Sequence, residues 1–190
     1  MSKKTDTAAK RVFIGIPAEK ELKEAVRVFR KDHDTLPVRW INQDNLHLTI
    51  VPPWLCSSVE PVCTLLEEIA SVLQDIDVTF TSVSPGPNAR KPRLLWATGS
   101  APSVLSTLQQ DLSALLSTDQ QEKRSYLLHL TIARIRFENQ GIIASKMPAL
   151  QVEWSAKLRK ICLYESLLKP SGAEYNVLCE APFGLKKVKE

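Results

Sequence analysis

The chain has 190 residues, of which 44% are hydrophobic and 24% are charged, the composition of an ordinary soluble globular protein. Its length suits one domain, or two small lobes that share one fold. No apolar run approaches the roughly 18–20 residues of a membrane helix, and no signal-peptide pattern follows the polar first ten residues, so we expect a cytoplasmic protein. The net charge of +4 is compatible with an anionic ligand.

The predicted elements alternate between strands and helices before the chain ends in strands. Apolar side chains recur at helical spacing in three segments, which begin near residues 18, 58 and 101 and reach residues 30, 73 and 115. Composition or alternation typical of strands occurs at 11–16, 38–41, 47–51, 77–83, 93–98, 127–135, 158–167 and 174–179. We expect Pro52 and Pro53 to end the third of these strands, because proline cannot donate to a sheet ladder. Breaks at 84–87 and 169–172 favour hairpins, so the sequence predicts an α+β fold with mostly antiparallel sheet.

The tetrapeptide HLTI occurs twice, at residues 47–50 and 129–132, and it contains two of the three histidines of the chain. Alternate side chains of a strand face the same side. His47 and Thr49 therefore share one face, His129 and Thr131 do the same in the second copy, and the aliphatic residues face the opposite side. A helix and a polar approach precede each copy, which predicts an internal duplication of two lobes rather than a repeat array.

Two lobes that face each other would bring two imidazoles and two hydroxyls into one cleft. An unperturbed pKa near 6.5 allows one imidazole to be neutral and the other protonated near neutral pH. A general base and a general acid are then available together, each typically contributing about 10²–10⁴ in rate. Threonine hydroxyls can donate to the non-bridging oxygens of a phosphate. This set suits in-line attack on a phosphodiester, and the sequence shows no carboxylate cluster that would hold a metal.

The four cysteines, Cys56, Cys63, Cys162 and Cys179, form no CxxC pair and no zinc-binding pattern with the histidines. We expect reduced, partly buried thiols, with a redox or nucleophilic role as the alternative.

The motifs resemble those of the 2H phosphoesterase superfamily, in particular the RNA 2',3'-cyclic phosphodiesterases long called 2'-5' RNA ligases. The segments that carry this resemblance, in family order, are RVFIGIPA, RWINQDNLHLTI, PRLLWATG, HLTIARIR and LYESLLKPSGAEYNVL. The resemblance implies a bilobal α+β fold with two pseudo-symmetric lobes, outer helices and a central cleft between two antiparallel sheets. We expect a flexible N-terminus at 1–10, a single bilobal domain at 11–185 and a basic tail at 186–190.

The resemblance also implies hydrolysis of an RNA-terminal or nucleoside 2',3'-cyclic phosphate to a 2'-phosphate, by a monomer that needs no metal and no cofactor. Position by position, it makes His47 the proton donor to the departing ribose 3' oxygen and His129 the proton acceptor that activates water. Thr49 and Thr131 become phosphate-binding residues. The residues themselves leave the order of the two histidines open, because the two motifs are identical.

Arg134 matches a family arginine that is expected to contact the phosphate, with a surface cation as the alternative. In a regular strand Arg134 would have the opposite parity to His129 and Thr131 and would point away from the cleft. A bulge or a strand end after Thr131 would bring it back. Further basic residues that could surround a phosphate are Arg90, Lys91, Arg93 and Arg136.

The chain departs from the family pattern beside both motifs, at 126–128 and at 51–54. Trp54, Trp40 or Tyr126 could stack on a base, although core packing is the interpretation that we favour for Trp40 and Trp96. His33 is expected at the surface. Two other functions stay open: ligation or hydrolysis of another 2'-5' linked or cyclic nucleotide, and an RNA-end binding module without catalysis.

Overall fold

The computed structural model describes residues 9–116, 126–169 and 172–184. The expected tail at 186–190, most of the expected flexible N-terminus and the middle of the expected turn at 169–172 lie outside the described residues. Within those ranges the helices are α1 (Lys20–Asp32), α2 (Glu60–Val72), α3 (Ser103–Leu115) and α4 (Gln140–Lys146), with short 3-10 turns η1 (Gln43–Asn45) and η2 (Phe137–Asn139). The strands are β1 (Lys10–Pro17), β2 (Arg39–Trp40), β3 (His47–Cys56), β4 (Ile76–Gly86), β5 (Leu94–Gly99), β6 (Leu128–Arg134), β7 (Leu150–Leu158), β8 (Lys160–Lys169) and β9 (Gly172–Pro182).

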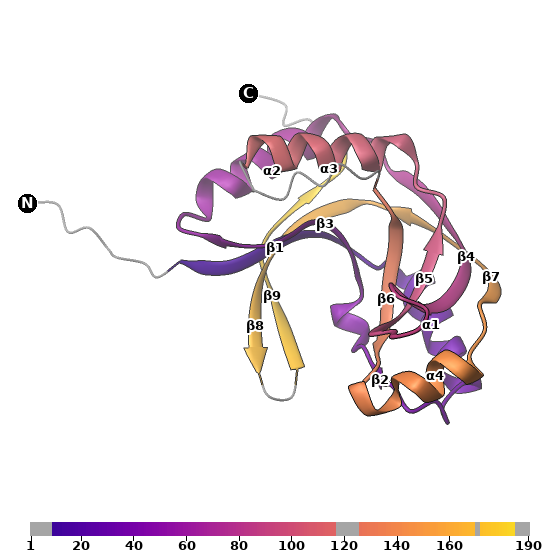
Figure 1. Ribbon diagram of the computed structural model, residues 1–190. Helices are drawn as coiled ribbons and strands as arrows, with labels where there is room; N and C mark the ends of the chain where they lie inside the picture. Colours follow the sequence, from indigo (N-terminus) through magenta and orange to yellow (C-terminus); the bar gives the residue numbers. More distant parts are fainter. Residues whose placement is uncertain (1–8, 117–125, 170–171, 185–190) are drawn as a thin grey trace, which may run out of the picture.

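The strands form two antiparallel sheets that curve around a common interior (Figure 1). The first sheet has the order β3-β1-β8-β9 and the second sheet has the order β2-β6-β5-β4-β7. The chain passes from the second sheet to the first between β7 and β8, which are almost continuous in sequence. This is the predicted α+β fold of two antiparallel sheets.

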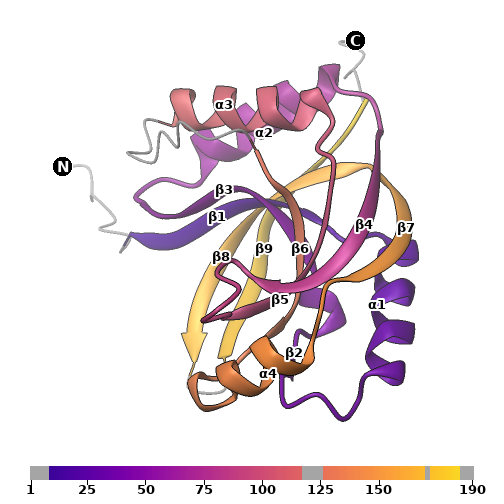
Figure 2. The ribbon, with the colours of Figure 1, turned by 45° about the vertical axis from the view of Figure 1, so that its right-hand side comes forward.

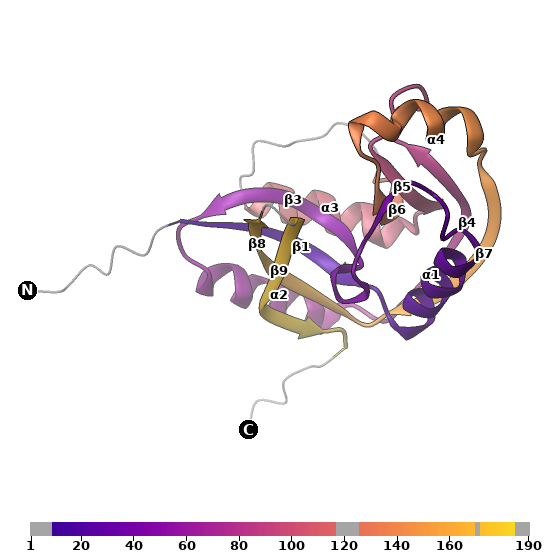
Figure 3. The same cartoon turned by 90° about the horizontal axis from the view of Figure 1, so that it is seen from below.

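The helices cover the outer sides of the two sheets. Helix α2 packs against β8 and β9 of the first sheet, whereas α1 packs against β7 of the second (Figure 2). Helix α3 contacts β3, and β3 also contacts β6 where the two sheets approach each other (Figure 3). The two strands that carry the HLTI copies therefore lie together although they belong to different sheets. Within the described ranges no helix has the length and apolar composition that crossing a membrane requires.

The expectation that Pro52 and Pro53 end their strand was wrong. Strand β3 continues to Cys56, and its pairing with β1 shifts register between Val51 and Trp54, so that both prolines fall in a bulge. Because β3 is at the edge of the first sheet, the missing proline N–H groups cost few ladder bonds. In the same way β4 extends through Pro85, beyond the last pair that it makes with β7.

Strand β7 and helix α4 are two elements that the sequence did not predict. Residues of β7 alternate between exposed and half-buried along most of its length, and polar side chains occupy the exposed positions. Apolar residues stand at every second position from Leu150 to Leu158, so the strand pattern is present in the sequence although the prediction missed it, and the strand pairs with β4 along nearly its whole length. The predicted hairpin of β4 and β5 is confirmed.

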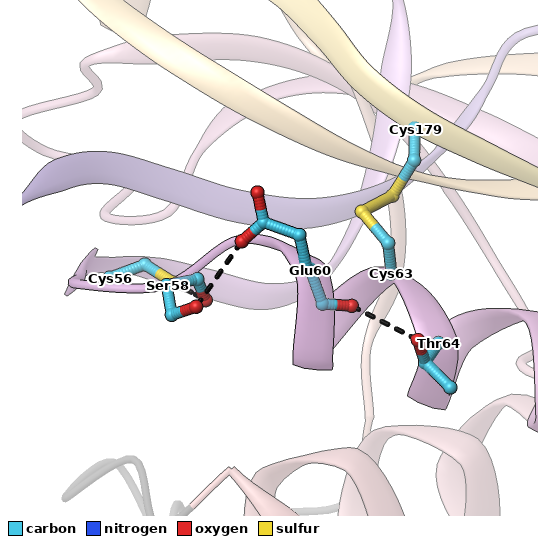
Figure 4. The surroundings of a disulfide bond; sticks show 6 residues. All are labelled: Cys56, Ser58, Glu60, Cys63, Thr64 and Cys179. Carbon is cyan, nitrogen blue, oxygen red and sulfur yellow. Dashed lines mark hydrogen bonds between the residues drawn. A yellow bond between two sulfur atoms is a disulfide. The ribbon is translucent and has the colours of Figure 1, made fainter. Parts of the chain in front are cut away.

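The expectation of four reduced thiols was wrong for two of them. Cys63 of α2 and Cys179 of β9 form a disulfide with their Cα atoms 6.0 Å apart (Figure 4). The two residues are 116 positions apart in sequence, and they meet because α2 packs on β9. Spacing along the chain cannot show such a pair. Cys56 and Cys162 are free and buried.

Candidate active site

Both HLTI copies lie at the start of their strands, with the predicted alternation of side chains. His47 and Thr49 are half-buried, whereas Leu48 and Ile50 are buried in the core. The second copy follows the same pattern on β6, with His129 and Thr131 half-buried and the two aliphatic residues fully buried. The aliphatic residues anchor each strand in the core, and the polar pair faces the space between the two sheets.

Each copy also contains a bulge at the isoleucine that follows the threonine. In the first sheet Gly15 pairs with Thr49 and Ile14 pairs with Val51, so Ile50 has no partner. In the second sheet the pairs pass from Thr131 to Ala133 in the same way, and Ile132 is left over. The bulge lets two successive residues point into the core, and it reverses the parity of everything that follows.

The bulge explains where Arg134 lies. Beyond it, Arg134 returns to the side of Thr131, and both side chains line the same cavity. The cavity has a volume of about 350 Å³ and lies between the sheets. Its lining residues are Arg11, Phe13, Ile41, Asn45, His47, Thr49, Pro53, Thr131, Arg134, Ser166, Ala173 and Tyr175. His129 is not among them, although its charge contributes to the lowered pKa of His47.

The two histidine rings are held in the same way. His47 Nδ1 lies 2.7 Å from the carbonyl oxygen of Asn45, and His129 Nδ1 lies 3.0 Å from that of Leu127. A carbonyl only accepts, so each Nδ1 carries a hydrogen and donates it. In the neutral rings Nε2 then has a free lone pair, and in both copies the accepting carbonyl belongs to the residue two positions before the histidine.

Aromatic side chains surround His47. Its ring centroid lies 4.8 Å from that of Phe13, 5.2 Å from that of Tyr175 and 5.9 Å from that of Tyr164. Gly15 allows this close packing, because a Cβ there would lie 3.3 Å from His47 Cδ2 and 3.0 Å from a backbone oxygen. Burial of the ring lowers the pKa of His47 to about 4, against the effect of the Asn45 hydrogen bond and with smaller contributions from the charges of His129 and Arg134.

Trp96 supports His129 from the side of β5. The two ring centroids are 5.3 Å apart in an edge-to-face arrangement. The indole crosses Gly86 so closely that a Cβ on that glycine would lie 2.4 Å from the ring. The expectation that Trp96 is a core residue is therefore incomplete: the ring is half-buried and packs on His129.

None of the three aromatic residues predicted to stack on a base lines the cavity. Trp40, Trp54 and Tyr126 pack against the hydrophobic core instead. Phe13 and Tyr175 do line it, although nothing in their sequence context separated them from core residues. His33, which was expected at the surface, is half-buried at the end of α1, stacks on Phe29 and is not one of these lining residues.

Arg11 is a further lining residue that sequence analysis did not single out as part of the site. Its guanidinium donates to Ser166 Oγ at 2.7 Å, across β1 and β8 of the first sheet. The cavity thus has one arginine on each side, Arg11 from the first sheet and Arg134 from the second. In the described part of the chain, no three His, Cys, Asp or Glu residues are grouped so that they could hold a metal ion.

Comparison with known proteins shows the family of this chain. Residues 17–169 match the 2'-5' RNA ligase superfamily. The chain belongs to this superfamily. One relative of this chain is a protein of Methanocaldococcus jannaschii named RNA 2',3'-cyclic phosphodiesterase. The two sequences are 23% identical over 175 residues, which cover 90% of this chain and 99% of the relative.

Solved structures share the fold of this superfamily member along nearly its whole length. The protein TT0787 of Thermus thermophilus has a TM-score of 0.73 at 18% identity, with 92% of this chain and 98% of that chain covered. LigT of E. coli in its apo form has a TM-score of 0.69 at 22% identity, with 94% and 100% covered. LigT has also been crystallised in complex with phosphate. The resemblance to the 2H phosphoesterases is confirmed.

Proposed function

We propose that this protein hydrolyses an RNA-terminal or nucleoside 2',3'-cyclic phosphate to a 2'-phosphate by two-histidine acid/base catalysis. The observation that carries the proposal is the matched pair of imidazoles. Each is tied through Nδ1 to a backbone carbonyl, each leaves Nε2 available, and each stands beside a threonine hydroxyl. The name of the M. jannaschii relative supports the same reaction.

The proposed reaction is a single in-line displacement at phosphorus. His129 Nε2 accepts a proton from water as the water oxygen bonds to phosphorus. The bond between phosphorus and the ribose 3' oxygen breaks, and His47 Nε2 donates a proton to that oxygen. Thr49 and Thr131 donate to the non-bridging oxygens, and the Arg134 guanidinium offsets the charge that develops on them.

The state of His47 in the free protein bears on this order. With a pKa of about 4 its ring is neutral at neutral pH, which suits a base better than an acid. As the proton donor, His47 therefore has to take up a proton when the anionic substrate binds. If it does not, the roles are exchanged and His129 is the acid.

The test is product analysis with an oligonucleotide that ends in a 2',3'-cyclic phosphate. His47→Ala and His129→Ala should each lower kcat by about 10²–10⁴ or more, the range of a general acid or base. His33→Ala is the matched control, because it removes the third histidine, which lies outside the site, and it should stay within twofold of wild type. Circular dichroism and melting curves check that all three variants fold.

Several results would count against the proposal. Turnover that survives both single replacements would remove the two-histidine mechanism. A 3'-phosphate product would show that the bond from phosphorus to the ribose 2' oxygen breaks instead of the bond to the 3' oxygen. The proposed reaction needs no metal, so activity should persist in a chelator, and its loss there would contradict that part.

The superfamily name favours a second candidate, ligation of a 2',3'-cyclic phosphate end to a 5'-hydroxyl end through a 2'-5' linkage. It uses the same groups, with the 5'-hydroxyl in place of water. Assays with and without a 5'-hydroxyl acceptor separate the two reactions. Tight binding of a cyclic-phosphate end with no turnover at all would instead indicate the RNA-end binding module.

We also propose that the protein is a monomer and acts in the cytoplasm. The Cys63–Cys179 bond counts against a strongly reducing compartment, because disulfides are rare there. Cell fractionation tests the location, thiol titration of the fractionated protein shows whether the Cys63–Cys179 bond has formed there, and light scattering tests the monomer.

A further inference from the structure

A second, smaller hollow lies at the end of β6. The cavity between the sheets that contains Thr49, Thr131 and Arg134 is called the reaction cavity from here on, after the proposed function. The second hollow has a volume of about 280 Å³, and its lining residues are Pro37, Val38, Arg39, Arg136 and Asn139. Apart from Asn139 they come from the same two stretches of chain, around β2 and the end of β6, that bring Ile41 and Thr131 to the reaction cavity. The two hollows thus follow each other along one pair of strands.

Backbone pairing shows how directly the two hollows are linked. Ile41 N–H donates to Ile132 O at 2.9 Å, and Arg39 pairs with Arg134 two residues further along β2 and β6. Directly opposite residues of an antiparallel pair point to the same side, with Cβ atoms about 4.5–5.5 Å apart. Arg134, which lines the reaction cavity, therefore has Arg39 of the second hollow as its cross-strand neighbour.

Arg136 adds a third guanidinium two residues beyond Arg134, a step of about 7 Å in an extended chain. The segment that carries it is fixed, because Asn139 Nδ2 donates to Pro37 O at 2.8 Å across the hollow. A carboxylate oxygen of Glu138 lies 3.9 Å from the Arg136 guanidinium.

The hairpin loop between β4 and β5 extends the basic surface. Ile135 N–H donates to Arg93 O at 2.9 Å, which places the loop beside the end of β6. Arg90, Lys91 and Arg93 are exposed, and among the described residues no carboxylate lies within salt-bridge distance of them. These three side chains therefore add positive charge beside the end of β6.

We propose that Arg39 and Arg136 bind the backbone phosphate that joins the terminal nucleotide of an RNA to the nucleotide before it. This inference rests on the proposed function and narrows its substrate to an RNA end rather than a cyclic mononucleotide. The cyclic phosphate occupies the reaction cavity beside Arg134, the terminal ribose spans the step along β6, and the next phosphate reaches the second hollow. A fixed pair of guanidiniums matches a phosphodiester, whose charge and oxygens both favour arginine.

The experiment compares two substrates of the wild-type enzyme that differ by that one phosphate. A nucleoside 2',3'-cyclic phosphate has no backbone phosphate, whereas a dinucleotide that ends in a 2',3'-cyclic phosphate has one. We expect kcat/KM for the dinucleotide to exceed that for the mononucleotide by about tenfold or more, as charge-assisted contacts to one anion would give. In the double variant Arg39→Gln/Arg136→Gln the ratio should fall to near one, with the mononucleotide rate within twofold of wild type.

The control variant Lys20→Gln/Lys157→Gln removes the same charge from α1 and β7 and should keep the wild-type ratio. Raising the salt concentration should lower the ratio in the wild type and in the control, but not in the arginine variant. The inference is overturned by a wild-type ratio near one. It is equally overturned if the arginine variant loses activity on both substrates alike, or if Arg11→Gln rather than the arginine variant removes the preference.

Failure of the proposed function would be recognised separately, as wild-type enzyme that turns over neither substrate. In that case calorimetry with the uncleavable 2'-phosphate forms of the mononucleotide and the dinucleotide measures the same preference as a ratio of dissociation constants. A tenfold preference that disappears in Arg39→Gln/Arg136→Gln supports the second phosphate site, and equal binding of the two ligands refutes it.

Discussion

Filling the reaction cavity with an anion should draw a proton onto His47. In the free protein, burial of the ring among aromatic side chains lowers the pKa of His47 to about 4, and the neighbouring charges of His129 and Arg134 add to the effect. A tetrahedral dianion placed between the threonine hydroxyls would attract the protonated His47 ring and so oppose the repulsion by the charges of His129 and Arg134. Sulfate is the suitable probe, because it does not titrate in the relevant pH range.

The size of the effect follows from the pKa. Lowering it from 6.5 to about 4 corresponds to about 3 kcal/mol against the protonated ring, at roughly 1.4 kcal/mol per pKa unit. One negative charge about 4 Å from the ring contributes about 4 kcal/mol at an effective dielectric constant near 20. A bound dianion is therefore sufficient to return the pKa of His47 to its ordinary range or above it.

Calorimetry of sulfate binding at pH 6, in two buffers of different ionisation enthalpy, measures the protons taken up. We expect close to one proton per anion bound in the wild type. His47→Gln should bind sulfate with much less uptake, whereas His33→Gln should resemble the wild type. NMR titration of the histidine Cε1–H signals, with and without sulfate, assigns the proton to a ring.

Two results would refute this reasoning. One is a His47 signal that already titrates near pH 6.5 in the free protein, which would show that burial does not disfavour the charged ring. The other is sulfate binding without proton uptake while His47 stays neutral. The second result would also make His47 the base and His129 the acid.

Three further predictions concern stability and support of the site. Below pH 6.5 His47 is protonated in the unfolded chain, whereas in the folded protein it stays neutral until about pH 4. The free energy of unfolding should therefore decrease between pH 6.5 and pH 4 by up to about 3 kcal/mol. Urea titrations should show a smaller decrease in His47→Gln. Gly86→Ala should displace Trp96, cost about 1–3 kcal/mol and lower kcat more than KM. Cys63→Ser should destabilise the protein by up to about 4–5 kcal/mol, because its bond to Cys179 closes a loop of more than a hundred residues.

Each of these has a decisive control. A pH dependence of stability that is identical in the wild type and in His47→Gln would contradict the first. Gly86→Ala with unchanged kcat would show that His129 does not depend on the indole. For the disulfide, wild-type protein in excess reductant should melt like Cys63→Ser, and four reactive thiols in untreated denatured protein would show that the bond had not formed.

Periodicity predicted the elements whose signal is local. The alternation in HLTI placed the aliphatic pairs in the core and the polar pairs between the sheets, and the helical spacing located the first three helices. Pro52 and Pro53 misled because the cost of a proline depends on the neighbours of the strand. A strand at a sheet edge with a bulge tolerates them, and neither the edge nor the bulge is visible in the residues themselves.

Contacts between distant segments could not be predicted in the same way. Arg11 meets Ser166, and Cys63 meets Cys179, because sheet order and helix packing bring them together. Arg134 is an intermediate case. In a regular strand its side chain would point away from the cavity. A bulge after Thr131 turns it toward the cavity, and the structure has that bulge.

The repeated tetrapeptide sets the geometry of the site but not its chemistry. Both copies have the same alternation, the same bulge and the same hydrogen bond from Nδ1 to a backbone carbonyl. Their surroundings differ, because three aromatic rings enclose His47 whereas the edge of Trp96 meets His129. The burial that lowers the pKa of His47 comes from neighbours that lie outside the repeat. In the proposed mechanism we therefore expect the assignment of acid and base to depend on β1, β8 and β9 on one side and on β5 on the other, so that exchanging those neighbours should exchange the roles.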